Sequence, residues 1–296
     1  MDDTFGIVVL FFYYFIFIIE MNTQEENIYE IIFSMQSGIK YFLGFIILSN
    51  FVLIFALRFQ IRITNKVKSM FGIQSIQDDL KKIRSVLLII AHPDDEIMFW
   101  SPTLKKLLAL NIKVKVLCLS NGNYNGIGDI RTEEFKAVSK SMHMEDNVIL
   151  NVPELQDDIT KKWDAKVVSK KIDDFLKKNN DIDTILTFDE NGVTKHPNHI
   201  SCYDGLVYYL KANRKEVKEK KTQIYLLDTF NPISQYTIFI PFWTFFFKQN
   251  GYFSWNFLFS YQHMSIYKSQ FNIMRRLHVL LSGYSYCNSY TKVELQ

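Results

Sequence analysis

The stretch VLLIIAHPDDE, residues 86–96, decides how this chain folds. Its first five residues are apolar and partly β-branched, and Pro93 soon follows, which is the pattern of a fully buried strand in a parallel sheet. Four polar residues come directly after the strand: His92, Asp94, Asp95 and Glu96. Because open α/β sheets bind ligands beyond the carboxyl ends of their strands, these residues are expected to form a reactive centre. The alternative is a polar turn in which the proline and the acids only begin a helix.

Strand-like and helix-like segments alternate along the chain that follows. Strands are expected at 113–119, 147–152, 184–188 and 224–229, and helices at 97–110, 163–178 and 199–210. Successive strand, helix and strand segments predict right-handed βαβ units. We therefore predict an α/β, Rossmann-like domain with a mostly parallel sheet flanked by helices, in which 224–229 is the last strand. The lysine-rich tract 211–221 is expected to be an exposed face or loop, or a contact with anionic lipid headgroups.

A second histidine-containing motif follows the strand at 184–188. It reads HPNH, residues 196–199, and its two histidines lie on one side of a turn or an opening helix. One histidine and one carboxylate from the first motif, with one histidine from the second, would give three nitrogen and oxygen ligands and room for a water. That is the ligand number of a catalytic zinc site, so we expect hydrolytic chemistry. Iron, manganese or cobalt would also accept these ligands.

Five motifs in order resemble the LmbE-like zinc de-N-acetylase family, and most closely its eukaryotic membrane branch, which acts on N-acetylglucosaminylphosphatidylinositol. They are AHPDDE, GNYNG at 122–126, Arg131 with Glu134, TFDENG at 187–192, and HPNH. The resemblance covers roughly residues 85–285 and implies an LmbE-type fold. It also implies hydrolysis of an acetamide to an amine and acetate in an early step of glycolipid-anchor (GPI) biosynthesis. The alternatives are a related enzyme for another N-acetylglucosamine conjugate and a membrane scaffold without activity.

The resemblance assigns roles to individual residues. His92, Asp95 and His199 match the metal ligands, and Asp94 matches the general base. His196 matches the histidine that polarises the substrate carbonyl. Amide hydrolysis needs these parts, namely an activated water, a base for its proton and positive charge near the developing oxyanion.

Asn123, Arg131 and Asp189 are candidate substrate-binding residues. The resemblance makes the loop that contains Asn123 a wall of the substrate site, and Arg131 could contact a phosphate or a sugar hydroxyl. Arg131 could equally be a solvated helix residue near Glu134. Asp189 could instead orient a ligand imidazole, or be a plain turn acid. The acids at 157 and 158 are expected to form a solvated turn rather than a metal pair.

Two apolar segments near the start of the chain predict a membrane anchor over residues 1–58. Residues 5–19 are too short for a typical span, whereas residues 39–57 approach spanning length. Basic residues from Arg58 to Lys68 follow the second segment and should stay cytosolic. Residues 59–82 read as a basic juxtamembrane linker, and the catalytic domain spans 83–296. With the resemblance, this organisation implies the endoplasmic reticulum membrane with the catalytic domain facing the cytosol.

Net charge, cysteine content and one aromatic segment limit the classes of partner that the sequence predicts. A net charge of +3 gives no reason to expect nucleic acid. The three cysteines lack metal-ligand spacing and suggest a reducing compartment. The aromatic segment 236–260 is expected to contact the membrane or cover a lipid substrate. Tyr267 stands where the family has a histidine, so we place both Tyr267 and the nearby His263 outside the core site.

Overall fold

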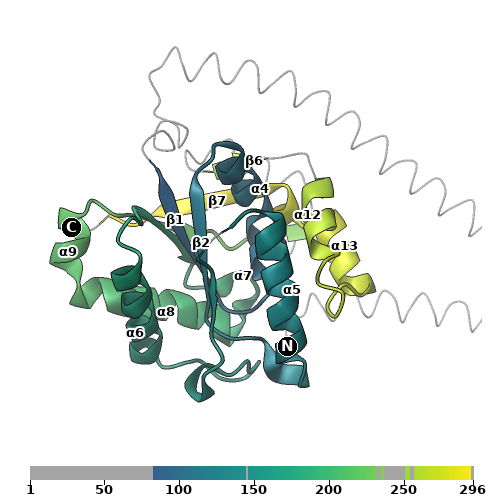
Figure 1. Cartoon of the computed structure of the whole chain (residues 1–296), viewed down its shortest axis with the longest axis horizontal. Helices are drawn as coiled ribbons and strands as arrows, with labels where there is room; N and C mark the ends of the chain where they lie inside the picture. The colour runs from purple at the N-terminus through teal and green to yellow at the C-terminus, as the bar shows by residue number, and fades with distance from the viewer. Residues whose placement is uncertain (1–82, 145, 232–234, 237–250, 254–256, 295–296) are drawn as a thin grey trace, which may run out of the picture. The chain divides into compact units, whose positions relative to one another are not determined.

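A sheet of parallel strands with an antiparallel edge forms the centre of the domain (Figure 1). The computed structural model describes residues 83–144, 146–231, 235–236, 251–253 and 257–294. The predicted anchor at 1–58, the linker at 59–82 and most of the aromatic segment 236–260 lie outside the described residues. Among the described residues, no helix combines the length and the apolar character needed to cross a membrane.

Seven strands of the described chain are arranged in the order β3-β2-β1-β4-β5-β7-β6. Their bounds are β1 Ser85–Ile90, β2 Lys113–Cys118, β3 Val148–Ile149, β4 Thr184–Phe188, β5 Gln223–Leu227, β6 Gly251–Phe253 and β7 Cys287–Lys292. The first five are parallel to their neighbours, whereas β7 is antiparallel to both β5 and β6. The prediction of a mostly parallel sheet is therefore confirmed. The prediction that 224–229 is the last strand is wrong, because β6 and β7 extend the sheet beyond β5.

Helices cover both faces of the sheet (Figure 1). The longer ones are α4 Asp95–Ala109, α5 Gly128–Ser141, α6 Ala165–Lys178, α8 Pro197–Ala212, α12 Phe257–Met264 and α13 Ile273–Leu281. The shorter ones are η1 Asn123–Asn125, η2 Pro153–Leu155, α7 Gly192–Lys195, α9 Arg214–Glu219 and η3 Gly283–Ser285. In Figure 1, α6 and α8 lie on one side of the strands, and α4, α5, α12 and α13 on the other. Part of the lysine-rich tract 211–221 is thus the helix α9.

The burial of β1 and α4 shows that they lie at the centre of the domain. Every residue of β1 is buried, because the strand pairs with β2 on one side and with β4 on the other. In α4 the residues from Asp95 to Leu104 are all buried, since α12 and η3 pack against the helix from outside. The first turn of α4 therefore carries its acids into the interior, where charge persists only with partners.

Candidate active site

The segments that follow β1 and β4 meet where the strand order of the sheet reverses. The chain runs from β1 outward through β2 to β3, and then returns to place β4 and β5 on the other side of β1. Because β1 and β4 are parallel neighbours, their carboxyl ends open into one crevice. β1 delivers the AHPDDE motif to this crevice, and β4 leads into the HPNH motif at the start of α8.

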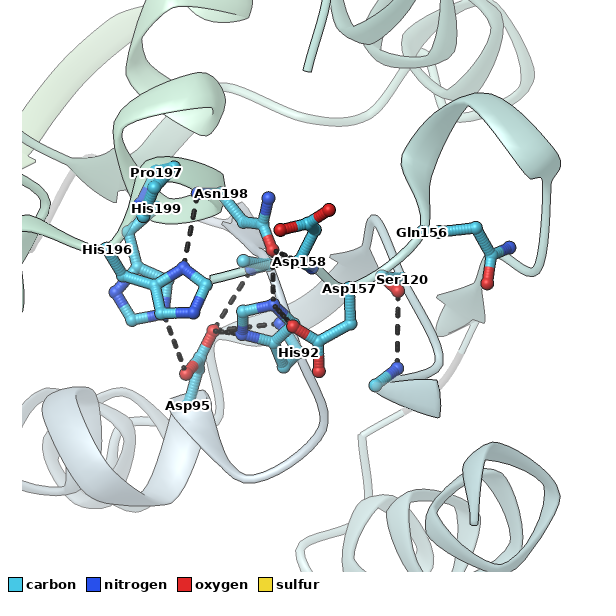
Figure 2. Close-up of polar contacts among 12 residues, drawn as sticks. His92, Asp95, Ser120, Gln156, Asp157, Asp158, His196, Pro197, Asn198 and His199 are labelled. Carbon is cyan, nitrogen blue, oxygen red and sulfur yellow. Dashed lines mark hydrogen bonds and ion pairs between the residues drawn. The ribbon is translucent and has the colours of Figure 1, made fainter. Parts of the chain in front are cut away.

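His92, Asp95 and His199 come together in this crevice. All three are buried, and their donor atoms lie within 4.8 Å of one another. Asp95 Oδ1 lies 3.3 Å from His199 Nε2, and Asp95 Oδ2 lies 3.8 Å from His92 Nδ1. Figure 2 shows the carboxylate between the two imidazoles. Burial opposes ionisation of Asp95, but His199 and His92 outweigh it and lower its pKa, so the carboxylate is charged.

The ring nitrogens that face away from Asp95 are each held by an oxygen. His92 Nε2 lies 3.1 Å from Asp157 Oδ1 and 3.0 Å from Asn198 Oδ1. His199 Nδ1 lies 3.1 Å from the Gly192 carbonyl oxygen. These partners assign the N–H to the outer nitrogen of each ring and leave the inner nitrogens as donors to a cation. Two imidazoles and one carboxylate arranged in this way fit a divalent metal ion.

Asp157 also belongs to a second group whose donor atoms lie within 4.8 Å of one another, with His92 and His196. Its contact with His92 is through Nε2, opposite the nitrogen that faces Asp95. This geometry makes Asp157 an orienting partner of His92. The prediction of a solvated turn for Asp157 is therefore wrong, because its carboxylate is 9% exposed and also lies 3.9 Å from Arg131.

Asp189 supports the site without touching a histidine. Its carboxylate accepts hydrogen bonds from the backbone N–H groups of Asn191, Gly192 and Thr229 and from the Thr229 hydroxyl. Gly192 in turn carries the carbonyl that contacts His199. Asp189 thus fixes the loop whose carbonyl contacts His199, which agrees with the alternative of a turn acid. The prediction that Asp189 itself orients a ligand imidazole is wrong, because the Gly192 carbonyl makes that contact.

Asp94 lies beside this group with one oxygen held and one free of hydrogen bonds. Its Oδ1 accepts a hydrogen bond of 3.2 Å from Arg131, whereas Oδ2 is buried and accepts none from the described residues. Asp94 has φ 98°, a left-handed backbone conformation that is unfavourable for residues other than glycine. Backbone strain of this kind is typical of functional positions.

Arg131 joins the loops that follow β1 and β2. It donates to the Pro93 and Gly122 carbonyls as well as to Asp94. The alternative of a solvated helix arginine is wrong, because Arg131 is buried. Glu134 does not hold it, since its carboxylate accepts hydrogen bonds from the Ser269 N–H and hydroxyl.

His196 borders the ligand group on the solvent side. Its Nδ1 accepts a hydrogen bond of 3.2 Å from the Asn198 N–H, so a neutral ring carries its proton on Nε2 (Figure 2). Burial and the neighbouring His199 and His92 lower the pKa of His196 to about 4. His196 can therefore donate a hydrogen bond from Nε2.

A cleft of about 400 Å³ opens over these residues. Besides the ligand group, it is lined by Asp94, Arg131, His196 and, from later in the chain, Tyr236, Arg275 and His278. Arg275 Nη2 lies 3.4 Å from Asp94 Oδ2. Among the predicted substrate-binding residues, Arg131 lines the cleft. The Asn123 side chain accepts a hydrogen bond from the Gly128 N–H, and its neighbours Tyr124 and Asn125 line the cleft instead.

Tyr267 and His263, which we placed outside the core site, differ in their distance from the AHPDDE turn. The Tyr267 hydroxyl donates to buried Glu96, whose other oxygen accepts from the Asp94 N–H. Tyr267 therefore buttresses the AHPDDE turn. His263 contacts the Phe259 carbonyl in its own helix and does not line the cleft.

The amino-acid sequence is similar to a known protein family and to several named relatives. A family model described as GlcNAc-PI de-N-acetylase matches residues 87–210. A probable N-acetylglucosaminyl-phosphatidylinositol de-N-acetylase of Dictyostelium discoideum is 32% identical over 243 residues, which cover 71% of this chain and 94% of that protein. A protein of the same name from Schizosaccharomyces pombe is 38% identical over 161 residues, which cover 53% of this chain and 62% of the length of that protein. The N-acetylglucosaminyl-phosphatidylinositol de-N-acetylase of Bos taurus is 34% identical over 131 residues, which cover 44% of this chain and 51% of the length of that protein.

A solved structure supports the fold. The N,N'-diacetylchitobiose deacetylase of Pyrococcus horikoshii superposes with a TM-score of 0.56 at 15% identity, over 79% of this chain and 92% of that one. The family-model match and the similarity to the Dictyostelium relative over 94% of its length lead to one conclusion: this chain belongs to the GlcNAc-PI de-N-acetylase family of LmbE-like proteins.

Proposed function

We propose that this protein hydrolyses the acetamide of N-acetylglucosaminylphosphatidylinositol to release glucosaminylphosphatidylinositol and acetate, an early step in the assembly of glycolipid anchors. The observation that carries the proposal is the convergence of His92, Asp95 and His199 beside Asp94 in one cleft of a family member. The substrate is proposed from the similarity to relatives that are named N-acetylglucosaminyl-phosphatidylinositol de-N-acetylases.

The three ligand residues would hold a divalent cation, which we propose to be zinc because two imidazoles and one carboxylate are a common zinc set. When bound, the cation would supply positive charge that polarises the acetamide carbonyl and makes a nearby water easier to deprotonate. The residues around it would carry out the remaining steps.

Asp94 is suited to act as the general base. Its Oδ2 accepts no hydrogen bond from the described residues and has only the ion pair with Arg275 at 3.4 Å. This oxygen can take the proton of the water that attacks the acetamide carbon, and return it to the nitrogen as the C–N bond breaks. Arg131 holds the other oxygen, so the carboxylate keeps one orientation. His196 would donate from Nε2 to the carbonyl oxygen as negative charge develops there.

The substrate's phosphate would lie towards Arg275. This guanidinium lines the cleft, and the side chain keeps 37% exposure, so it can contact a ligand from the open side. Arginine binds phosphate oxygens with two parallel N–H groups, which fixes orientation as well as charge.

We further propose that the chain is anchored in the endoplasmic reticulum membrane with the catalytic domain in the cytosol. The support is in the sequence, where the apolar residues 39–57 precede the basic residues Arg58, Arg62, Lys66 and Lys68. An anchor confines the enzyme and its lipid substrate to one surface, which raises their effective concentration.

Acetate release from the glycolipid by the purified full-length chain tests the function. Chelation should abolish the activity, and metal analysis should find one divalent ion per chain, lost in His92→Ala and His199→Ala. Asp94→Asn should keep the metal and lose roughly a hundredfold or more in kcat. Asp158→Asn is the matched control, because this acid lies in the loop beside Asp157 but outside the cleft. A wild-type chain that holds metal and releases no acetate from this lipid would overturn the proposal.

A further inference from the structure

We propose that the exposed face of α13 rests on the lipid bilayer, so that the cleft opens at the membrane surface. The inference rests on the proposed function in one respect, namely that the substrate is a glycolipid whose acyl chains stay in the bilayer. The proposed partner is a membrane leaflet that contains anionic phospholipids.

The first observation is a cluster of exposed apolar side chains on α13. Ile273 is 66% exposed, Met274 62%, Leu277 42% and Leu281 51%. At 3.6 residues per turn, positions 273, 274, 277 and 281 fall within about 100° of the helix circumference, so they form one stripe. Single exposed apolar residues are ordinary, but a contiguous stripe on a short helix marks a surface that contacts something apolar.

The rest of the circumference of the same helix is fixed by the domain. Val279 is fully buried in the core, while Arg275 and His278 line the cleft. Asn272 caps the helix by accepting a hydrogen bond of 3.0 Å from the Arg275 N–H, so the helix begins at a defined residue. The helix therefore cannot rotate to bury its apolar stripe without withdrawing its cleft residues.

The position of α13 links the stripe to the reacting groups. The Arg275 guanidinium reaches Asp94, and the apolar stripe lies on the outer side of the same helix. One helix diameter is roughly 10 Å, so a headgroup would rise by about that height from the bilayer to reach the cleft. The neighbouring helix α12 adds Leu258, which is 54% exposed, and the cleft rim adds Tyr236, which is 55% exposed.

The charge of this part of the chain favours an anionic membrane. Between Asp228 and Glu294 the sequence contains no acidic residue, although it contains Lys268, Arg275 and Arg276. Lys268 and Arg276 are exposed. On α13 itself Arg276 is exposed, whereas Arg275 is turned to Asp94 in the cleft. Basic side chains near an apolar helix face favour the headgroup region of anionic membranes.

The first test asks where the stripe lies, independently of activity. The full-length chain would be reconstituted in vesicles of phosphatidylcholine and phosphatidylinositol with an environment-sensitive fluorophore on Leu277→Cys. Leu110→Cys is the matched control, since Leu110 is 45% exposed and lies at the end of α4, away from the cleft. The native cysteines Cys118, Cys202 and Cys287 are buried, so background labelling should be low.

Brominated lipids should quench the probe at position 277 about threefold more strongly than the probe at position 110, and aqueous iodide should show the reverse order. Two results would overturn the inference. Equal iodide quenching at both positions would mean that the stripe faces water. Protection of position 277 from both quenchers would mean that another protein segment covers the stripe.

The second test asks whether docking matters for catalysis. The triple variant I273S/M274S/L277S should lose roughly tenfold or more of the hydrolysis rate on glycolipid in vesicles, and retain the wild-type rate on the deacylated, water-soluble headgroup. The control L110S/Y208S changes two comparably exposed residues elsewhere and should retain both rates.

Equal losses on both substrates would refute a docking role for the stripe. If the wild-type chain hydrolyses neither substrate, the proposed function fails, and the quenching experiment still decides where α13 lies.

Discussion

The loop held by Asp189 offers the sharpest test of how the fold sets the site. Its carboxylate accepts four hydrogen bonds, from three backbone N–H groups and from the Thr229 hydroxyl. The loop that it fixes presents the Gly192 carbonyl to His199. The perturbation is Asp189→Asn, which preserves the shape of the side chain and replaces one acceptor oxygen with a donor.

The hydrogen bonds of Asp189 set the expected loss in the free energy of unfolding. Oδ1 accepts from the N–H groups of Asn191 and Gly192, and Oδ2 accepts from the N–H of Thr229. Either orientation of an amide therefore leaves at least one of these N–H groups facing an NH₂ group, which costs about 1–3 kcal/mol. Loss of the charge on the remaining bonds brings the expected decrease in the free energy of unfolding to roughly 2–4 kcal/mol.

The functional effect should appear in metal binding. Loss of a partner that orients a ligand imidazole typically weakens metal affinity by about 10- to 100-fold, and we expect a value in this range. Competition with a graded chelator measures the affinity, and thermal unfolding measures the stability. Asp158→Asn is the control, because Asp158 caps Thr160 in a similar way in a solvated turn. Metal affinity of Asp189→Asn within twofold of wild type would refute the reasoning.

Three further predictions concern packing, pH and the general base. Gly205→Ala would place a Cβ 2.2 Å from Val168 Cγ1, so it should lower the free energy of unfolding by about 1–3 kcal/mol, and the added Val168→Ala should recover part of that loss in thermal unfolding. Burial and Arg275 lower the pKa of His278 to about 4, so the unfolded chain takes up the proton first and stability falls as the pH drops from 6.5 towards 4. His278→Gln should reduce this slope by up to about 1.4 kcal/mol per pH unit, and an unchanged slope in unfolding experiments would count against neutral, buried His278. Arg131→Lys should retain the metal and lose kcat, since one ammonium cannot replace the bonds to two carbonyls and Asp94; steady-state kinetics with unchanged kcat would contradict this role.

The sequence predicted the parallel strands of the sheet because most of them are largely apolar and buried, above all β1 and β4. It missed β7 for the opposite reason, since Cys287–Lys292 reads CNSYTK and resembles a polar loop. The structure can bury Asn288 of this strand because its side-chain amide is satisfied: it accepts a hydrogen bond from the Thr103 hydroxyl and donates to the Phe99 carbonyl. Such pairing depends on residues far apart in sequence, so no local pattern indicates it.

The site residues also divide into those that a local sequence pattern identifies and those that depend on distant contacts. Residues inside the two motifs were identified because their spacing places them at the ends of adjacent strands. Asp157 was taken for a turn acid because its burial depends on the distant His92. Arg275 and His278 reach the cleft from a helix that follows a long aromatic segment, and nothing local relates them to Asp94.

The C-terminal part of the chain, from β6 to β7, has a consequence for engineering. The matched family region ends at residue 210 and contains every proposed ligand, whereas Arg275 and His278 come from later in the chain. Exchanging this tail between homologues should redirect the enzyme to other acetylated sugars while its chemistry stays intact. A working chimera must preserve the contacts between the tail and α4, which include the hydrogen bonds of Tyr267 with Glu96 and of Asn288 with Thr103 and Phe99.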